Sequence, residues 1–507
     1  MKESLSGVGL PLLGTISLVG LIAWGILWPV EEISIETSPR QPSTVELDVD
    51  FIGMHAGARR WRLIADEMLL QGELQLFEQG ARGWLFGDSS PPGRTSEAPL
   101  FFDEREDVWW QAESAVYHTN LNRLDLSQNV RVHDSQGTLL KTETLEVHAD
   151  HRIEALAAFV LESPDVALSG RTGTFDFNLS ELSAWQGKVL VSSGSSSPSS
   201  NDVQTDVETI TIEADRVDYN RDTETARAEG NLVIFQGDTT VRAPRGVYRN
   251  QTSASQLVGG VVLEEPSRVL SSERMRGDHQ EKVFQFEENV VFTQVEESPP
   301  TDEESVIEEV ERSHTEVRAT SLTYNSRTET ANFKDSVELI QDGRQARSTE
   351  ATVEPSTIVL SGDVQMDQES GDWLARRASN SEVQDALQLP TRIYAERVEI
   401  DRQTNDVHFY DRVLVIQAQR SAQGSEGIYR DSSQSLELIG ESEPALLCER
   451  VSVASSSQAP EDSNLPDIRE RDALCRGADR ISSHTIVFDL EHNTLSTQGP
   501  SQFQFRL

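Results

Sequence analysis

A spacing of 29 residues recurs through the later part of this chain and constrains its fold more than any other feature. The interval separates successive anchor residues in three groups: Tyr219, Tyr248 and Gly277; Tyr324 and Val353; Ile400 and Tyr429. A fixed period of this size is typical of a repeat architecture, in which each unit buries its apolar face by stacking on its neighbours. At typical strand length, one such unit holds about two strands.

Two further positions are tied to six of these anchors. Eleven residues after the anchor stands a small or polar residue, and two residues later stands Leu or Val in all but the last copy. The first set is Gly230, Gly259, Glu288, Asp335, Asp411 and Gly440. The second set is Leu232, Val261, Val290, Val337 and Val413, with Ser442 in the last copy. Tyr117, Gln128 and Val130 show the same spacing earlier in the chain.

The clearest unit is the segment Ala214–Phe235. Val217 and Tyr219 alternate with charged residues, Asn220 begins a polar turn, and an apolar run follows. This alternation around a turn predicts a hairpin with one buried face. Four glycines, Gly230, Gly259, Gly260 and Gly187, are expected to mark strand bends or bulges. The repeated pattern predicts an all-β fold, either a β-solenoid or an elongated jelly roll.

The composition and the motif content argue against several classes of function. The formal net charge is −41, which argues against a nucleic-acid partner because phosphate binding needs clustered Lys and Arg. The charge predicts a solvated exterior, and no EF-hand loop or glycine-rich nonapeptide supports calcium binding. The ten His are scattered, and no zincin, nucleophile-elbow or P-loop motif occurs. We therefore expect no enzyme, no cofactor and no metal site.

The two cysteines, Cys448 and Cys475, flank a polar insertion, Ser452–Arg471. Two Cys in 507 residues do not make a disulfide framework. In an oxidising compartment a bond between them would close this loop and stabilise the fold by roughly 3–4 kcal/mol. The sequence leaves open whether they form this bond or remain two buried thiols.

The amino-terminal segment predicts a membrane anchor. Ser4–Val30 holds no charged residue, and its apolar centre from Leu10 is about 20 residues, enough to span a bilayer core. Lys2 precedes the run and two Glu follow it, which favours a cytoplasmic amino terminus. A cleaved signal peptide is disfavoured because no small-x-small site precedes Glu31.

Composition also suggests domain boundaries. Ser192–Asn201 has the makeup of a flexible linker, and Gln294–Arg312 is rich in acidic residues. The predicted parts are a cytoplasmic tip and transmembrane helix (1–31), a first β block (45–191), a Ser-rich linker (192–207), repeats (208–293), an acidic linker (294–312), and further repeats with polar insertions (313–507).

The first block resembles the LptC family of lipopolysaccharide transport proteins over about residues 8–191. An ordered set of short pieces behind the apolar segment carries this resemblance: Trp61, Leu63, Ala65 and Asp66; Asn129–Val132; Gly137, Leu140 and Thr142; Pro164–Val166; and Gly187–Val189. The later blocks resemble the related LptA/OstA repeats, with Ala214–Tyr219 and Glu229–Ile234 as the matching pieces. Family LptC proteins end near the first block, whereas this chain adds some 300 residues.

The resemblance implies a twisted, open, antiparallel β-jellyroll with an apolar groove. It implies a single-pass inner-membrane protein whose bulk is periplasmic, and which takes lipopolysaccharide or a related lipid from an inner-membrane ABC transporter. It also implies that an LptA-like protein, or an OstA domain at the outer membrane, pairs with an edge strand.

The residues that would line such a groove are the apolar positions of the repeats: Val130, Val132, Leu232, Ile234, Val261, Val290, Phe292, Val337 and Val413. Each buried CH₂ of a lipid is worth roughly 0.8 kcal/mol, so a continuous apolar lining would shield acyl chains from water. For any single residue, packing of a closed core is the simpler interpretation. The alternative function is a membrane-anchored β-solenoid that acts as a scaffold or adhesin, with a sealed core instead of an open groove.

Overall fold

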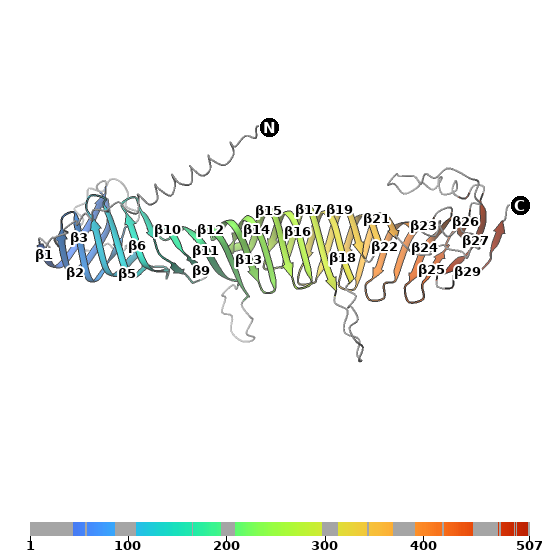
Figure 1. The fold of residues 1–507 in the computed structure, drawn as a ribbon, viewed down its shortest axis with the longest axis horizontal. Coiled ribbons are helices and arrows are strands. Elements are labelled where there is room, and N and C mark those ends of the chain that lie inside the picture. Colours follow the sequence, from blue (N-terminus) through green and yellow to red (C-terminus); the bar gives the residue numbers. More distant parts are fainter. Residues whose placement is uncertain are drawn as a thin grey trace, which may run out of the picture.

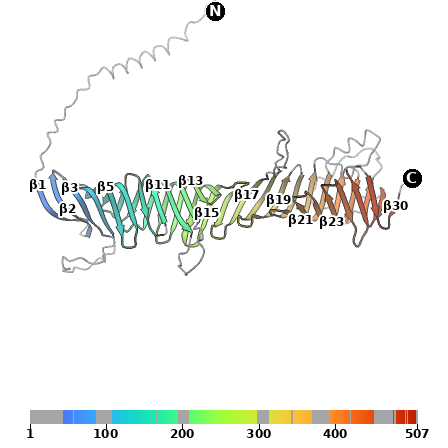
Figure 2. The ribbon, with the colours of Figure 1, turned by 90° about the horizontal axis from the view of Figure 1, so that it is seen from below.

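The computed structural model describes residues 44–55, 58–86, 108–164, 166–193, 208–296, 313–341, 344–368, 391–417, 420–449, 475, 478–490, 492 and 494–504. Within them the chain forms one antiparallel sheet of 30 strands. The strands succeed one another along a long, twisted body, with β1 at one end and β29 and β30 at the other (Figures 1 and 2). The all-β prediction is thus confirmed.

The first part of the sheet comprises β1 (Thr44–His55), β2 (Ala58–Gln71), β3 (Leu74–Leu85), β4 (Val108–His118), β5 (Arg123–Asp134), β6 (Leu139–His148), β7 (Arg152–Ala155), β8 (Phe159–Glu162), β9 (Val166–Gly170), β10 (Thr172–Asp176) and β11 (Glu181–Ser193). Up to β6 each strand pairs with the next along the chain. Then β7 and β8 together lie along β6, and β9 and β10 lie between them and β11.

The middle comprises β12 (Glu208–Asn220), β13 (Thr225–Gln236), β14 (Thr239–Arg249), the 3₁₀ turn η1 (Asn250–Thr252), β15 (Ala254–Glu265), β16 (Arg268–Asp278), β17 (Val283–Glu296), β18 (Ser313–Asn325), β19 (Thr330–Gln341), β20 (Arg344–Val353), β21 (Thr357–Gln368), β22 (Thr391–Asp401), β23 (Val407–Gln417) and β24 (Arg420–Arg430). These strands form an unbroken meander.

The last part comprises β25 (Ser435–Ile439), β26 (Ala445–Glu449), β27 (Asp479–Ser483), β28 (Thr485–Asp489), β29 (Thr494–Gln498) and β30 (Gln502–Gln504). Here two short strands again take the place of one long strand. β25 and β26 both lie along β24, β28 and β27 lie along them, and β29 and β30 form the outermost row.

A crease crosses the long strands near their midpoints and folds the sheet into two leaves. In β5 the register shifts between Ser127 and Val130, and the two residues between them, Gln128 and Asn129, have φ of 65° and 52°. Such a bulge bends the strand. We call the arms on the side of Val130–Asp134 leaf A and those on the side of Arg123–Ser127 leaf B.

The crease explains the position eleven residues after each anchor. In alternate strands of the middle the crease is a pair of residues with positive φ: Gly230 and Asn231, Gly259 and Gly260, Glu288 and Asn289, Asp335 and Ser336, Gly362 and Asp363, and Asp411 and Arg412. Short polar side chains or glycine suit this backbone conformation. The expected bends at Gly230, Gly259 and Gly260 therefore lie at the crease, and Gly187 follows Gln186, whose φ is 50°.

The 29-residue spacing itself corresponds to two strands, one running from leaf A to leaf B and one returning. The anchors consequently fall at the same point of successive even-numbered strands. Their register links them through intervening residues into one inward-facing line on leaf B, for example Tyr219, Ala226, Tyr248 and Ser255. The repeat thus maps onto a single row of side chains along the body.

The proposed linkers join strands that pair with each other. β11 pairs with β12 from Glu181 to Ser193, and β17 pairs with β18 from Val283 to Glu296. The sheet is therefore continuous across 194–207 and 297–312, and the domain boundaries remain a prediction from composition. These segments, and 87–107, 369–390 and 450–474, all connect strand ends on leaf A, whereas the leaf B ends are joined by short turns.

The expected membrane anchor, Leu10–Val30, lies outside the described residues. Among the residues that the structure does describe, none forms a helix long and apolar enough to cross a bilayer.

Candidate functional site

The nine candidate groove residues all lie on the inner face of leaf A, and all are buried, with at most 2% of each side chain exposed. Five of them follow the crease directly and face a small residue on the next strand: Leu232 and Ala243, Val261 and Ser272, Val290 and Ala319, Val337 and Ser348, Val413 and Gly424. The structure thus brings the candidates together along one leaf.

Leaf B supplies the opposite wall of the interior. Its residues were not among those predicted from the sequence to line a groove. The line of anchors contributes buried rings such as Tyr219, Tyr248 and Tyr324, and Phe284 and Phe286 lie beside it. The repeat spacing could have identified these leaf B residues, because each anchor faces inward and lies two strand lengths from the next anchor. The buried apolar side chains of both leaves form one cluster from Val49 to Phe488.

Aromatic rings join the two leaves inside the fold. At the amino-terminal end, Trp61 of leaf A contacts Tyr117 of leaf B with ring centroids 4.9 Å apart. In the middle, Phe292 of leaf A contacts Phe333 of leaf B at 5.5 Å. Such ring pairs add about 0.5–1.5 kcal/mol to the free energy of burial. The leaves are therefore packed against each other at these points.

Polar side chains bridge the free edges of the two leaves, opposite the crease. We call these contacts the mouth bridges. Arg221, in the leaf B turn between β12 and β13, forms an ion pair with Asp134 of leaf A and donates a hydrogen bond to Thr138 Oγ1 at 2.9 Å. Gln236 of leaf A donates to the backbone oxygen of His279 in the leaf B turn after β16, at 3.0 Å. Each bridge joins strands that are several rows apart.

Another of the mouth bridges centres on Arg268 of leaf A, whose side chain is 8% exposed. Its guanidinium lies 2.5 Å from Glu329 Oε2 and donates to Tyr324 Oη at 3.3 Å. Tyr324 in turn donates to Glu265 Oε2 at 2.5 Å. Burial, and then the hydrogen bond to Glu265, raise the pKa of the Tyr324 phenol. The phenol therefore keeps its proton throughout the neutral range and can donate to Glu265.

A further bridge has a different chemistry. The guanidinium of Arg344 on leaf A lies 5.6 Å from the ring centroid of Tyr429 on leaf B, in cation–π geometry. Burial, followed by a hydrogen bond to Asp431, raises the pKa of the Tyr429 phenol to about 12. Polar contacts thus close the mouth at several points along the body.

Cys448, on β26, forms a disulfide with Cys475, with their Cα atoms 5.3 Å apart. Of the two alternatives that the sequence left open, the structure has the bond. It ties the start of the insertion after β26 to the residues that lead into β27.

Comparison with known proteins adds little to this picture. No protein-family model and no curated protein matches the chain. Among solved structures, it is similar to LptH from Pseudomonas aeruginosa, described as the LptA-homologous periplasmic component of the lipopolysaccharide transport device. The match covers 25% of this chain and 82% of LptH, with 16% identity and a TM-score of 0.21. A likeness this weak carries no argument about function, so the LptC resemblance stays a prediction.

Proposed function

We propose that this chain carries the acyl chains of lipopolysaccharide, or of a related lipid, along the interior of its folded sheet. The observation that carries the proposal is the single apolar cluster, which runs through both leaves from Val49 near one end to Phe488 near the other. A lipid with several acyl chains gains roughly 0.8 kcal/mol for each CH₂ removed from water. In this proposal the protein is a carrier and has no catalytic role.

Loading requires the mouth bridges to part, because the candidate residues are closed off from solvent in the lipid-free fold. The cost is the loss of a few hydrogen bonds and ion pairs, each worth about 1–3 kcal/mol. Water at the opened mouth solvates Arg221, Gln236 and His279, which lowers that cost. Burial of several acyl chains between the leaves exceeds it.

The two ends of the sheet fit a bridge between membranes. At the amino-terminal end, Val45 and Leu47 of the edge strand β1 are 52% and 73% exposed. We propose that this end receives lipid from an inner-membrane ABC transporter, with Leu10–Val30 as the anchor and the sheet in the periplasm. At the other end, β29 and β30 leave backbone groups for strand addition by an LptA-like or outer-membrane OstA-domain protein.

One observation favours the second candidate function, a sealed scaffold or adhesin. The nine inner residues of leaf A are almost fully covered, and ring contacts such as Phe292 with Phe333 hold the leaves together. A scaffold needs this closed core for stability, whereas a carrier must open it.

Photocrosslinking separates the two functions. A photoreactive amino acid is placed at Val261, which faces the interior of β15, or at Val262, which faces outward on the same strand. Cells making each variant are irradiated, and lipopolysaccharide attached to the protein is detected. A carrier should give a strong lipid adduct from position 261 and little from 262. Equal adducts from both positions, or none from 261 in a variant shown to be folded by circular dichroism, would favour the scaffold.

A further inference from the structure

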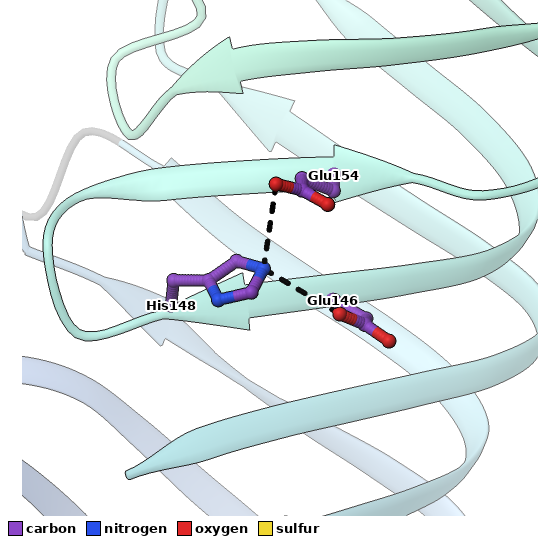
Figure 3. Close-up of side chains that lie close together, drawn as sticks. All are labelled: Glu146, His148 and Glu154. Carbon is purple, nitrogen blue, oxygen red and sulfur yellow. Dashed lines mark ion pairs between the residues drawn. The ribbon is translucent and has the colours of Figure 1, made fainter. Parts of the chain in front are cut away.

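Three metal-ligating side chains converge on the outer face of leaf B, where β6 pairs with β7. Glu146 and His148 are two residues apart on β6 and therefore point to the same face. Glu154 on β7 is the register partner of Glu146. One ligand atom from each residue lies within 4.8 Å of the other two (Figure 3). No metal site was expected from the sequence, because its ten His are scattered and no EF-hand or zincin motif occurs.

The distances within this group suit a shared cation better than direct contacts. His148 Nε2 lies 3.5 Å from Glu146 Oε2 and 3.8 Å from Glu154 Oε1. Both distances exceed those of ordinary hydrogen bonds, and Nε2 is shielded from solvent without a hydrogen-bond partner. Ligands placed about 2.0–2.2 Å from a tetrahedral Zn²⁺ are separated from one another by roughly 3.3–3.6 Å. The imidazole and the carboxylates already stand near that separation.

The two negative carboxylates, Glu146 and Glu154, also favour a bound cation electrostatically. Glu146 and Glu154 lie directly opposite each other on antiparallel strands, an arrangement that is destabilising for like charges. Arg123 Nη1, at 3.3 Å from Glu146, and Arg152 Nη1, at 2.9 Å from Glu154, offset part of the repulsion. Each arginine contacts the same oxygen that lies near His148, namely Glu146 Oε2 and Glu154 Oε1. A carboxylate has about four lone-pair sites, so a metal ion can share these oxygens or bind the second oxygen of each carboxylate.

We propose that Glu146, His148 and Glu154 bind a divalent transition-metal ion, with Zn²⁺ as the best fit. Ca²⁺ and Mg²⁺ favour all-oxygen ligand sets, whereas an imidazole with carboxylates suits Zn²⁺. The three side chains are about one-fifth exposed, so a water molecule can take the fourth position.

The location indicates a structural role for the ion. β6 pairs with β7 through only three residue pairs, because the row breaks between Ala155 and Phe159. A metal bound to Glu146 and His148 on β6 and to Glu154 on β7 links the two strands where the backbone pairing is short. This role does not depend on the proposed lipid transport.

The test titrates the full-length chain in detergent with ZnCl₂ by isothermal calorimetry. Excess Mg²⁺ is present to occupy the many exposed carboxylates. We expect one high-affinity site per chain, and His148→Gln should weaken it at least about 10-fold, since losing even a partner outside the ligand shell costs a metal site about 10–100-fold in affinity. His314→Gln is the matched control, since His314 stands two residues from Glu316 on β18, with Nε2 and Oε2 4.0 Å apart, and has no third ligand among the residues that the structure describes. It should bind Zn²⁺ like the wild type.

Hydrogen exchange gives a second readout. Zn²⁺ should slow amide exchange over 145–155 in the wild type and in His314→Gln, and not in His148→Gln. Exchange over β12–β24 reports whether each variant is folded. The proposal is overturned if the wild type shows no site above the Mg²⁺ background. It is equally overturned if His148→Gln binds Zn²⁺ as tightly as the wild type.

Discussion

From β12 to β24 each strand crosses the crease as one continuous strand, whereas the rows of β7–β10 and β25–β30 consist of two short strands each. Every second continuous strand bends at a pair of residues with positive φ, such as Gly259 and Gly260. In the broken rows the chain leaves the sheet instead, at Leu156–Ala158 and again between Ile439 and Ala445. The bend between leaf A and leaf B is thus formed either by positive-φ residues within a continuous strand or by an interruption between two short strands.

Two glycines illustrate these two kinds of corner. An added Cβ at Gly260, where φ is 88°, would meet no atom within 4 Å. At Gly173 in β10, where φ is ordinary, the added atom would lie 2.6 Å from the ring of Phe159. Phe159 packs against Phe175 with centroids 5.0 Å apart and fills the interior beside the break. Gly260 thus serves the backbone conformation of the crease, whereas Gly173 makes space for a ring, as Gly246 in the middle also does for Leu257.

The largest effect is expected in the carboxy-terminal broken rows, which the disulfide stabilises. Replacing both Cys448 and Cys475 by Ser opens a loop with a sequence separation of 27. The free energy of unfolding for β25–β30 should fall by about 3–4 kcal/mol in the chain-entropy model. Native-state hydrogen exchange measures this, with β12–β24 as the internal reference. Unchanged protection in the terminal rows would show that they are as stable as the middle without the bond.

A smaller effect is expected for Gly173→Ala, because the methyl group overlaps Phe159. Overpacking of this kind costs about 1–3 kcal/mol. The second substitution Phe159→Leu should recover part of the loss, which a double-mutant cycle of denaturant unfolding would detect. If Phe159→Leu gives no recovery, Gly173 does not serve to accommodate the ring, and the proposed difference between the two regions fails there.

The smallest effect is expected for Gly260→Ala, where only the backbone conformation is penalised. A left-handed conformation costs an L-residue roughly 1–2 kcal/mol. Gly260→Asn should cost less, since Asn tolerates this region better than Ala, and Val262→Ala on the same strand controls for general loss of β propensity. Denaturant midpoints of the three variants provide the ranking. Equal destabilisation by Ala and Asn would mean that positive φ is not what requires glycine at this crease.

The periodic sequence predicts much of the fold. Alternation around Asn220 predicts the hairpin of β12 and β13, and Gly230 and Gly259, eleven residues after their anchors, predict strand bends that lie at the crease. The broken rows could not be predicted in this way, because nothing in the local pattern of β7 and β8 distinguishes a bent strand from an interrupted one. For the candidate site, the sequence pattern identified the residues of the leaf A wall, such as Leu232 and Val261. It did not predict that ring contacts and mouth bridges close the space between the leaves.

The inward-facing residues can be read from the sequence, because side chains alternate along a strand and the 29-residue spacing returns each anchor to the same row. Their partners across the interior follow from the folded sheet alone. Arg221 meets Asp134, and Trp61 meets Tyr117, because the sheet folds at the crease and brings together strands that do not pair. Likewise Glu146 and Glu154 become opposite neighbours only through the register of β6 with β7. Local periodicity does not encode such contacts, since they depend on how far one leaf is displaced along the other.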